Sequence, residues 1–253
     1  MYDQSSILVV VVLFILILSA NEVGSFFGSR YHKKNGEDIK TQPSAILGGV
    51  FGLLALLLGF TFSMALQRFD NRTEAQINEA NAIGTALLRT TLLPEPYPKE
   101  AHKLLQQYVT VRLEMLNIDI TKREERKRLI RKTEQLQDLM WATAAAVELD
   151  PRPVTTGLFV TALNQLIDAQ GKQNTIQQQH VPEVIFLLLF LVFIAAGALM
   201  GYAKGLGKNR SRIPTTIFIF LIVLVVFLII DLDRPRRSLI RVSQESMLDL
   251  KSD

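Results

Sequence analysis

Few residue types in this chain are suited to catalysis or metal binding. The 253 residues include no cysteine, which excludes disulfides, thiolate metal sites and cysteine nucleophiles. The three histidines, His32, His102 and His180, lie far apart in the sequence and form no ligand pair at helical spacing. The sequence offers no convincing pair of nucleophile and base. We therefore expect a protein that is not an enzyme and that holds neither a metal nor an organic cofactor.

Two carboxylates stand out because they end long apolar runs. Glu22 ends the first run and Asp231 ends the last. A carboxylate inside a membrane is costly and is by default a functional candidate, whereas at the membrane edge its cost is small. Arg234 follows Asp231 by three residues, a spacing at which helical side chains meet. We favour an ion pair at the helix end for Asp231 and an interfacial position for Glu22, and a functional role for either residue stays open.

A basic run in the middle of the chain is suited to attracting anions or lipid headgroups. It places seven cations within eleven residues: Lys122, Arg123, Arg126, Lys127, Arg128, Arg131 and Lys132. A solvated helix face also explains the run, and we favour that interpretation. No aromatic side chain is interleaved with these cations, and the segment 67–181 holds 15 Lys and Arg against 14 Asp and Glu. Nucleic acid is therefore not an expected partner.

Four apolar blocks dominate the chain and must position these groups. Each block is long enough to cross a hydrocarbon core of about 30 Å, which requires a helix of about 20 residues. The blocks run from Ile7 to about Ala20 with an extension to Phe27, from Ala45 to Leu66, from Val184 to Ala203, and from Ile213 to Ile230. Residues 1–6 contain no Lys or Arg, and no small-residue cleavage site follows the first block closely. We therefore interpret that block as a spanning helix and not as a signal peptide.

These blocks predict an all-α integral membrane protein with a helical extramembrane domain inserted between the second and third of four transmembrane helices. The predicted parts are transmembrane helices 1 and 2 in residues 1–66, the helical domain in 67–181, transmembrane helices 3 and 4 in 182–231, and a C-terminal tail in 232–253. Four spans place both termini and the helical domain on the same side of the inner (plasma) membrane. The side is undetermined, because eight cations would be cytoplasmic in one orientation and seven in the other.

The segment after the second span is expected to be helical. No proline occurs between residues 44 and 91, so the span can continue as one rod on the order of 70 Å long at about 1.5 Å per residue. Its extramembrane part carries an apolar stripe of Ile77, Ala80, Ile83, Leu87 and Leu88. Three further helices are predicted: one with Ala101, Leu104, Leu105, Tyr108, Val111 and Met115 on one face, one from about Lys122 to Glu148, and one that starts after an N-cap at Thr155 or Thr156.

Motifs in and around the spans occur together in one known family. They lie at residues 58–64 with Arg68, at 79–85, at 92–94, at Asn164, Ile167 and Asp168, and at 231–236 and 239–244. Together they resemble the bestrophin-like domain family of bacterial membrane proteins. The order of the parts, and Leu58-Gly59-Phe60 followed by Arg68, also resembles the bestrophin chloride channels. That resemblance implies a homo-oligomer, a pentamer by analogy, whose second transmembrane helix lines a pore with a hydrophobic neck.

The resemblance assigns the neck to named positions. Phe60 corresponds to a neck residue, and helical spacing adds Leu56 and Met64. Apolar rings of this kind can gate a pore by dewetting. Contact with lipid or with neighbouring helices explains the same row, and both interpretations stay open. Calcium gating is not implied, because Asp231 and Asp233 are interleaved with arginines instead of forming an acidic run.

Five glycines and three tail charges have structural roles in this interpretation. Glycines at spacing four let helices approach closely, which predicts helix packing at Gly48, Gly52, Gly59, Gly197 and Gly201. In the tail, we expect Asp233, Arg234 and Arg236 to form ion pairs beside the last span or to anchor it to lipid.

Two classes of function fit the sequence. The first is a homo-oligomeric channel, because four helices packed on each other fill their own centre and leave room for a pore only between copies. Its preference for anions is implied by the resemblance to bestrophin chloride channels. Its partners are other copies of the chain, membrane lipid and small anions. The second is a non-conducting membrane scaffold or sensor that acts through its helical domain. Ion flux across liposomes distinguishes the two.

Overall fold

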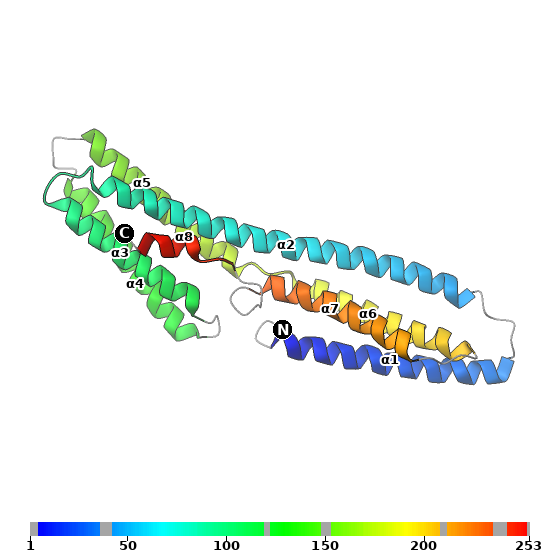
Figure 1. Ribbon diagram of the computed structural model, residues 1–253. Coiled ribbons are helices and arrows are strands. Elements are labelled where there is room, and N and C mark those ends of the chain that lie inside the picture. The colour runs from blue at the N-terminus through cyan, green and yellow to red at the C-terminus, as the bar shows by residue number, and fades with distance from the viewer. Residues whose placement is uncertain are drawn as a thin grey trace. The chain divides into compact units, whose positions relative to one another are not determined.

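The described residues of the computed structural model form helices joined by short connections. They are residues 5–35, 42–118, 122–147, 153–207, 212–234 and 242–251. The elements are α1 (Ser6–Asn35), α2 (Gln42–Thr90), α3 (Tyr97–Asn117), α4 (Arg123–Val147), α5 (Pro153–Gln178), α6 (Glu183–Leu206), α7 (Ile213–Asp233), α8 (Glu245–Leu248) and a 3₁₀ turn, η1 (Asp249–Lys251) (Figure 1). The expected all-helical composition is confirmed within these residues.

Four stretches are long and apolar enough to cross a membrane. They are Ser6–Lys34, Ala45–Thr90, Val154–Leu206 and Ile213–Asp233. The third stretch includes both α5 and α6, and its uncharged apolar part is α6 between Val184 and Ala203. The stretches therefore correspond to the four blocks expected from the sequence.

Two compact units make up the chain. The membrane unit comprises Met1–Gln67 and His180–Arg234, and the domain unit comprises Arg68–Gln179 and Pro235–Asp253. Helix α2 contributes its first part to the membrane unit and its second part to the domain unit.

In the membrane unit, α1 and α6 run parallel with their backbones in contact. Glycine positions of α6 lie against α1 in register: Gly197 against Ile17, Gly201 against Asn21, and Gly205 against Ser25. Residue numbers rise together along both helices, so the helices point the same way. Helix α7 also contacts α1, and the ring of Phe218 on α7 lies 5.2 Å from that of Phe51 on α2.

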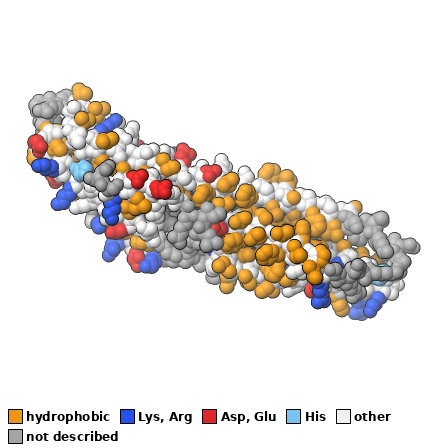
Figure 2. Space-filling view, viewed as in Figure 1, with side chains coloured by type: hydrophobic (Ala, Val, Ile, Leu, Met, Phe, Trp, Pro, Cys, Tyr) orange, Lys and Arg blue, Asp and Glu red, His pale blue; other side chains and the backbone are white. Residues whose placement is uncertain are grey.

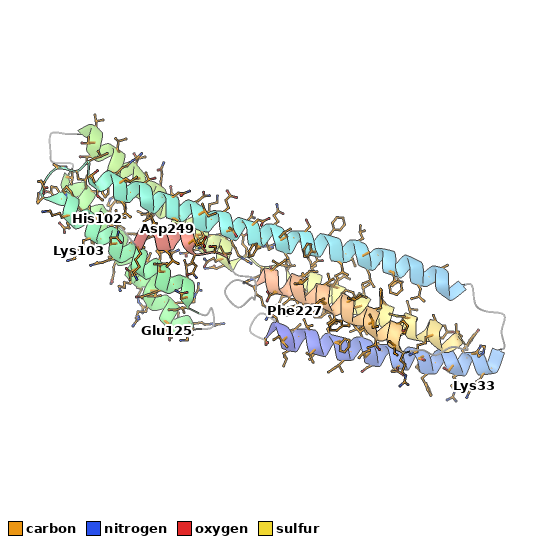
Figure 3. All side chains as sticks on the ribbon, in the orientation of Figure 1. Lys33, His102, Lys103, Glu125, Phe227 and Asp249 are labelled. Atoms are coloured by element: carbon orange, nitrogen blue, oxygen red, sulfur yellow. The ribbon has the colours of Figure 1, made fainter. Side chains whose placement is uncertain are left out.

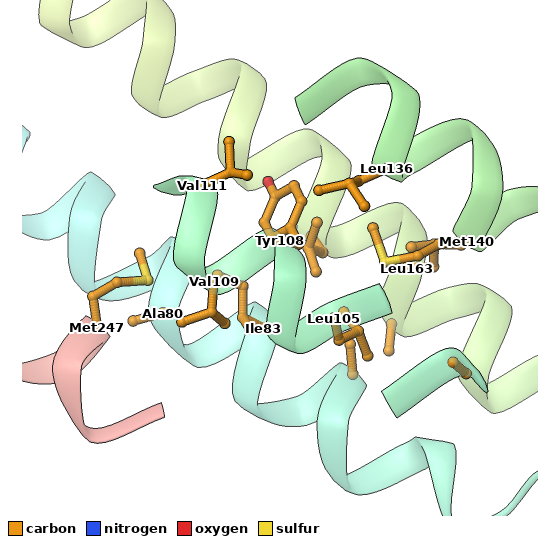
Figure 4. Close-up of a cluster of buried hydrophobic side chains, with 14 of the residues drawn as sticks. Ala80, Ile83, Leu105, Tyr108, Val109, Val111, Leu136, Met140, Leu163 and Met247 are labelled. Atoms are coloured by element: carbon orange, nitrogen blue, oxygen red, sulfur yellow. The ribbon is translucent and has the colours of Figure 1, made fainter. Parts of the chain in front are cut away.

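In the domain unit, apolar side chains from α2, α3, α4 and α5 form one core. Ile83, Leu105, Tyr108, Met140 and Leu163 are all fully buried in it (Figure 4). The face expected for α3 is buried at five of its six positions, and Leu104 is partly buried. The i, i+3, i+4 spacing of apolar residues in each helix is therefore what produces this core.

Two local predictions for the domain unit are wrong. Ile77 and Leu88, placed on the apolar stripe of α2, are 45% and 76% exposed, because the buried face of α2 lies nearer Glu79, Ile83 and Ala86. Helix α5 begins at Pro153, so Thr155 and Thr156 lie in its first turn and neither is the N-cap. Proline is favoured at a first helical position, where its missing N–H costs nothing.

The end of the C-terminal tail belongs to the domain unit. Met247 of α8 is fully buried in the core, and the side-chain amide of Gln76 donates a hydrogen bond of 2.7 Å to the carbonyl oxygen of Ser243. Gln106 donates one of 3.3 Å to the carbonyl oxygen of Leu250. These contacts tie α8 and η1 to α2 and α3.

Candidate functional site

One face of α2 is left uncovered by the rest of the membrane unit. Leu56 and Phe60 are 56% and 63% exposed, and Gly52 is also exposed. Leu54, Thr61 and Ala65 lie on the opposite side of the helix and are buried. The two faces follow from helical geometry, because residues four apart lie on one side, whereas residues two or five apart lie on nearly opposite sides.

The uncovered face changes from apolar to polar along its length. Ser63 and Gln67 continue the row of Gly52, Leu56 and Phe60, and both are exposed. Met64 lies at the edge of this row and is half-buried. Of the three predicted neck residues, Leu56 and Phe60 therefore share the centre of the face, and Met64 flanks it.

The structure places the five predicted packing glycines in two different settings. A Cβ atom on Gly197 would lie 2.8 Å from the Ile17 side chain, and one on Gly201 would overlap the Asn21 carbonyl. Both glycines therefore lie where α6 meets α1. Gly48, Gly52 and Gly59 have open space around the corresponding position, so nothing in their own chain requires their small size.

Sequence reasoning missed three further glycines at the contact between α1 and α6. Gly24 and Gly28 of α1 abut the backbone at Ala198 and Tyr202, and Gly205 abuts Ser25. The buried side-chain amide of Asn21 adds a hydrogen bond of 3.1 Å to the carbonyl oxygen of Gly197. The spacing of four between Gly24 and Gly28 was the signal in the sequence that pointed to this contact.

Glu22 lines a pocket of about 590 Å³ in the membrane unit. Its carboxylate is 3.8 Å from Lys204 Nζ and 3.4 Å from Arg212 Nη2. The pocket is lined by Glu22, Ser25, Phe26, Ser29, Arg30, Lys33, Lys204 and Arg212. No sequence pattern pairs Glu22 with residues almost 200 positions away, so this cluster was not foreseen.

The charged residues at the end of α7 are buried within the membrane unit. Asp233 is fully buried and accepts hydrogen bonds from the backbone N–H of Val181 at 3.0 and 3.2 Å. Asp231 and Arg234 are 3% and 4% exposed, and Arg234 donates a hydrogen bond of 3.2 Å to Ser6 Oγ. Asp233 thus fixes the chain just before α6. Arg236 lies outside the described residues.

A buried ion pair links α2 to α3 in the domain unit. Arg112 Nε lies 2.5 Å from Glu79 Oε1, and Arg112 Nη2 lies 3.0 Å from Glu79 Oε2. Arg112 Nη2 also donates to Gln173 Oε1, and the Tyr108 hydroxyl donates to Glu79 Oε1 at 3.5 Å. The four side chains come from α2, α3 and α5 and are at most 1% exposed. A paired geometry of this kind is what makes a buried charge tolerable.

The pKa values of two members of this cluster follow from burial and from the Glu79 charge. Burial raises the pKa of the Tyr108 phenol far above its ordinary value, and the Glu79 carboxylate raises it further. Burial opposes the charge on Arg112, but the Glu79 carboxylate, through its charge and its hydrogen bond, and Tyr108 together outweigh that effect and hold the pKa of Arg112 above its ordinary value. The folded domain therefore favours a neutral Tyr108 and a charged Arg112.

The basic run, formed by Lys122 and the first turns of α4, is a solvated surface. Six of its seven cations are exposed, and Arg126 is half-buried. Lys122 and Lys127 pair with Glu125 and Glu124 at 3.2 and 2.9 Å, three residues away along the chain. Among the described residues, no group of three or more His, Asp and Glu side chains is arranged to hold a metal ion.

Comparison with known proteins identifies the family. The family model for the bestrophin-like domain matches residues 11–247. The chain belongs to the bestrophin-like family. This confirms the resemblance carried by the motifs of the second span and the tail. The sequence of this bestrophin-like protein matches none of the curated proteins with which it was compared.

Solved structures share the fold of this bestrophin-like protein. A variant of a bacterial bestrophin homologue from Klebsiella pneumoniae has 18% sequence identity over 96% of this chain and 98% of its own, with a TM-score of 0.68. A second variant of that homologue has 17% identity, coverages of 95% and 99%, and a TM-score of 0.67. A structure described as a membrane protein has 17% identity, coverages of 98% and 98%, and a TM-score of 0.67.

Proposed function

We propose that this bestrophin-like protein is a homo-oligomeric channel for small anions, in which each copy contributes α2 to a shared pore. Leu56 and Phe60, flanked by Met64, form the hydrophobic neck. The observation that carries the proposal is the uncovered face of α2. Its span is 11% buried by the chain itself, against 22% to 33% for the other three candidate spans, so α2 has the most surface to share with other copies or with water.

Helical backbones allow such a pore. In a helix each N–H and C=O group is bonded within the helix, so a ring of helices borders water without leaving unpaired groups in the hydrocarbon. Gly48, Gly52 and Gly59 leave room beside α2 that a second copy of α2 can occupy. Membership of the bestrophin-like family supports the channel assignment, and the preference for anions rests on the resemblance to bestrophin chloride channels.

Apolar side chains on the domain unit support self-association as well. Leu88 and Val154 are 76% and 77% exposed, and Leu158 is 42% exposed. They come from the last turns of α2 and the first turns of α5, which are joined by a hydrogen bond of 2.7 Å from Arg89 Nη1 to the carbonyl oxygen of Leu158. An apolar surface of this kind outside the membrane is typical of a protein interface. A second copy of the chain is the partner that also completes the pore.

The domain organisation belongs to the same proposal. Residues 1–66 and 182–231 form the membrane part of each subunit, 67–181 the inserted helical domain and 232–253 the tail. Both termini and the domain lie on one side of the inner membrane. Figure 2 shows hydrophobic side chains over the visible face of the membrane-spanning helices, as expected for a surface in contact with lipid.

The experiment is chloride flux through proteoliposomes that contain the purified protein. We expect wild-type protein to conduct and Phe60→Ala to conduct several-fold faster, because a smaller side chain widens and wets the neck. Phe220→Ala is the matched control, since Phe220 is 55% exposed on α7 and lies outside the proposed neck. Absence of flux in all three proteins would favour a membrane scaffold instead.

A further inference from the structure

A cationic pocket at one end of the membrane unit lies where a lipid headgroup would be. Six of its lining residues recur at helical spacing along α1 and so form one face of that helix. They are Glu22, Ser25, Phe26, Ser29, Arg30 and Lys33. Lys204 closes the pocket from the last turn of α6, and Arg212 immediately precedes α7. Figure 3 shows Lys33 near the end of α1. The pocket therefore lies at the edge of the apolar spans.

The charges of the pocket favour an anion. Four lining residues are cations and one, Glu22, is a carboxylate, which leaves a net charge of +3. The Glu22 carboxylate is 53% exposed, so water solvates part of its charge. The hydroxyl group of Ser25 and the four cationic side chains are hydrogen-bond donors of the kind that bind phosphate oxygens.

Lys204 is the feature that distinguishes this pocket from a solvated surface. Its side chain is only 10% exposed, although a lysine of this kind is usually exposed. The nearest Glu22 oxygen is 3.8 Å from Nζ, which is beyond the range of a direct hydrogen bond. A largely buried ammonium group needs an acceptor, and an anion in the pocket would supply one.

The glycine contact between α1 and α6 lies directly beside the pocket. Gly205, next to Lys204, abuts Ser25 and Gly28 of α1. Because the two backbones touch here, Lys204 lies close beside the lining residues of α1. A site on packed helices positions its donors more precisely than a site on loops.

An apolar wall argues for lipid over free phosphate. Phe26 lines the pocket and is 60% exposed, and its ring packs edge-on against Phe27, which is 59% exposed. An inorganic anion makes no favourable contact with such an apolar surface, whereas the glycerol backbone and acyl chains of a phospholipid can pack against it. We propose that this pocket binds the phosphate of an anionic phospholipid, with Lys204, Arg212, Arg30 and Lys33 as its cationic donors.

The test is retention of phosphatidylglycerol by the full-length protein in detergent, measured by native mass spectrometry. We expect wild-type protein to retain phosphatidylglycerol and not phosphatidylcholine, and Lys204→Gln with Arg212→Gln to weaken retention by about tenfold or more. The exposed Lys127 on α4 provides the matched control, since Lys127→Gln removes a cation outside the pocket. Equal retention by the pocket variants and wild type would overturn the proposal.

Two further arms keep the proposal falsifiable if the double variant folds poorly. Glu22→Gln removes the single carboxylate from the pocket and is expected to strengthen retention of phosphatidylglycerol, and a loss of retention would contradict the proposed role of the pocket. Millimolar inorganic phosphate is expected to displace the lipid only weakly. Displacement by phosphate as effective as by soluble short-chain phosphatidylglycerol would show that a free anion, and not lipid, is the ligand.

Discussion

Arg112 of α3 and Glu79 of α2 form a fully buried ion pair in which both guanidinium contacts reach the same carboxylate, at 2.5 and 3.0 Å. The pair joins the part of the long helix α2 that lies in the domain unit to α3. The contact therefore helps to fix the position of α2 against α3 within the domain unit.

Removal of one member of the pair is expected to destabilise the domain unit strongly. Arg112→Met leaves Glu79 buried without its main partner, which costs about 3–5 kcal/mol and should lower the melting temperature by roughly 10 °C. Trp141 on α4 is the only tryptophan, so its fluorescence reports unfolding of this unit. The double change Glu79→Leu with Arg112→Met should recover part of the loss, and Lys127→Ala should leave the melting temperature unchanged. A single variant as stable as wild type would contradict the structural role of the pair.

Tyr108 predicts how stability depends on pH. Because the folded protein disfavours the phenolate, the pKa of Tyr108 is raised above its ordinary value of 10.0, and its contribution to stability is complete below that value and declines as pH rises above it. Alkaline titration followed by near-ultraviolet absorbance should show one tyrosine that ionises only as the protein unfolds. In Tyr108→Phe that delayed step should be absent, and its persistence would show that another tyrosine is responsible.

Glycines at the contact between α1 and α6 and glycines on the open side of α2 predict different effects of a Gly→Ala substitution on subunit stability. Gly201→Ala places a methyl group against the Asn21 carbonyl and should separate α1 from α6, so less protein should remain monodisperse after heating in detergent. Gly52→Ala meets open space within the chain and should leave the subunit as stable as wild type. Equal stability of both variants would contradict the close contact of α1 with α6.

Membrane topology can be tested with introduced cysteines, because the chain has none of its own. Cysteines at the exposed positions Ser5 and Lys127 should react with an impermeant thiol reagent from one side of the membrane, and a cysteine at Lys34 from the other. Reaction of Ser5→Cys and Lys127→Cys from different sides would exclude the four-span arrangement.

Periodicity and length were sufficient to predict α1 to α7, because both are local properties of the sequence, whereas the short α8 and η1 were not predicted. The span ending near Leu66 and its continuation to Thr90 follow from apolar content and the absence of proline. The charge clusters could not be predicted in this way. Glu79 and Arg112 meet across helices, as do Glu22 and Lys204, and a single sequence contains no signal for such pairings.

Polar residues on buried faces explain the errors in the expected α2 stripe. Counting only apolar residues placed Ile77 and Leu88 inside, whereas the buried face includes Gln76, Glu79 and Thr90. These polar groups are hydrogen-bonded: Thr90 to Leu87 within its own helix, and Gln76 and Glu79 to residues far away in the sequence. Hydrogen bonds of either kind are not visible in hydrophobic periodicity. The uncovered face around Phe60 was likewise assigned from a family resemblance and not from the pattern, because lipid-facing and pore-facing apolar residues have the same composition.

Chloride flux through Phe60→Cys, measured before and after a charged, water-soluble thiol reagent, tests the channel proposal most directly. If α2 lines a pore, the reagent reaches position 60 from water and flux falls to a small fraction of its initial value. Phe220→Cys, exposed on α7, should conduct as before. Flux that the reagent leaves unchanged in Phe60→Cys would mean that this face of α2 contacts lipid, and the proposed pore would be wrong.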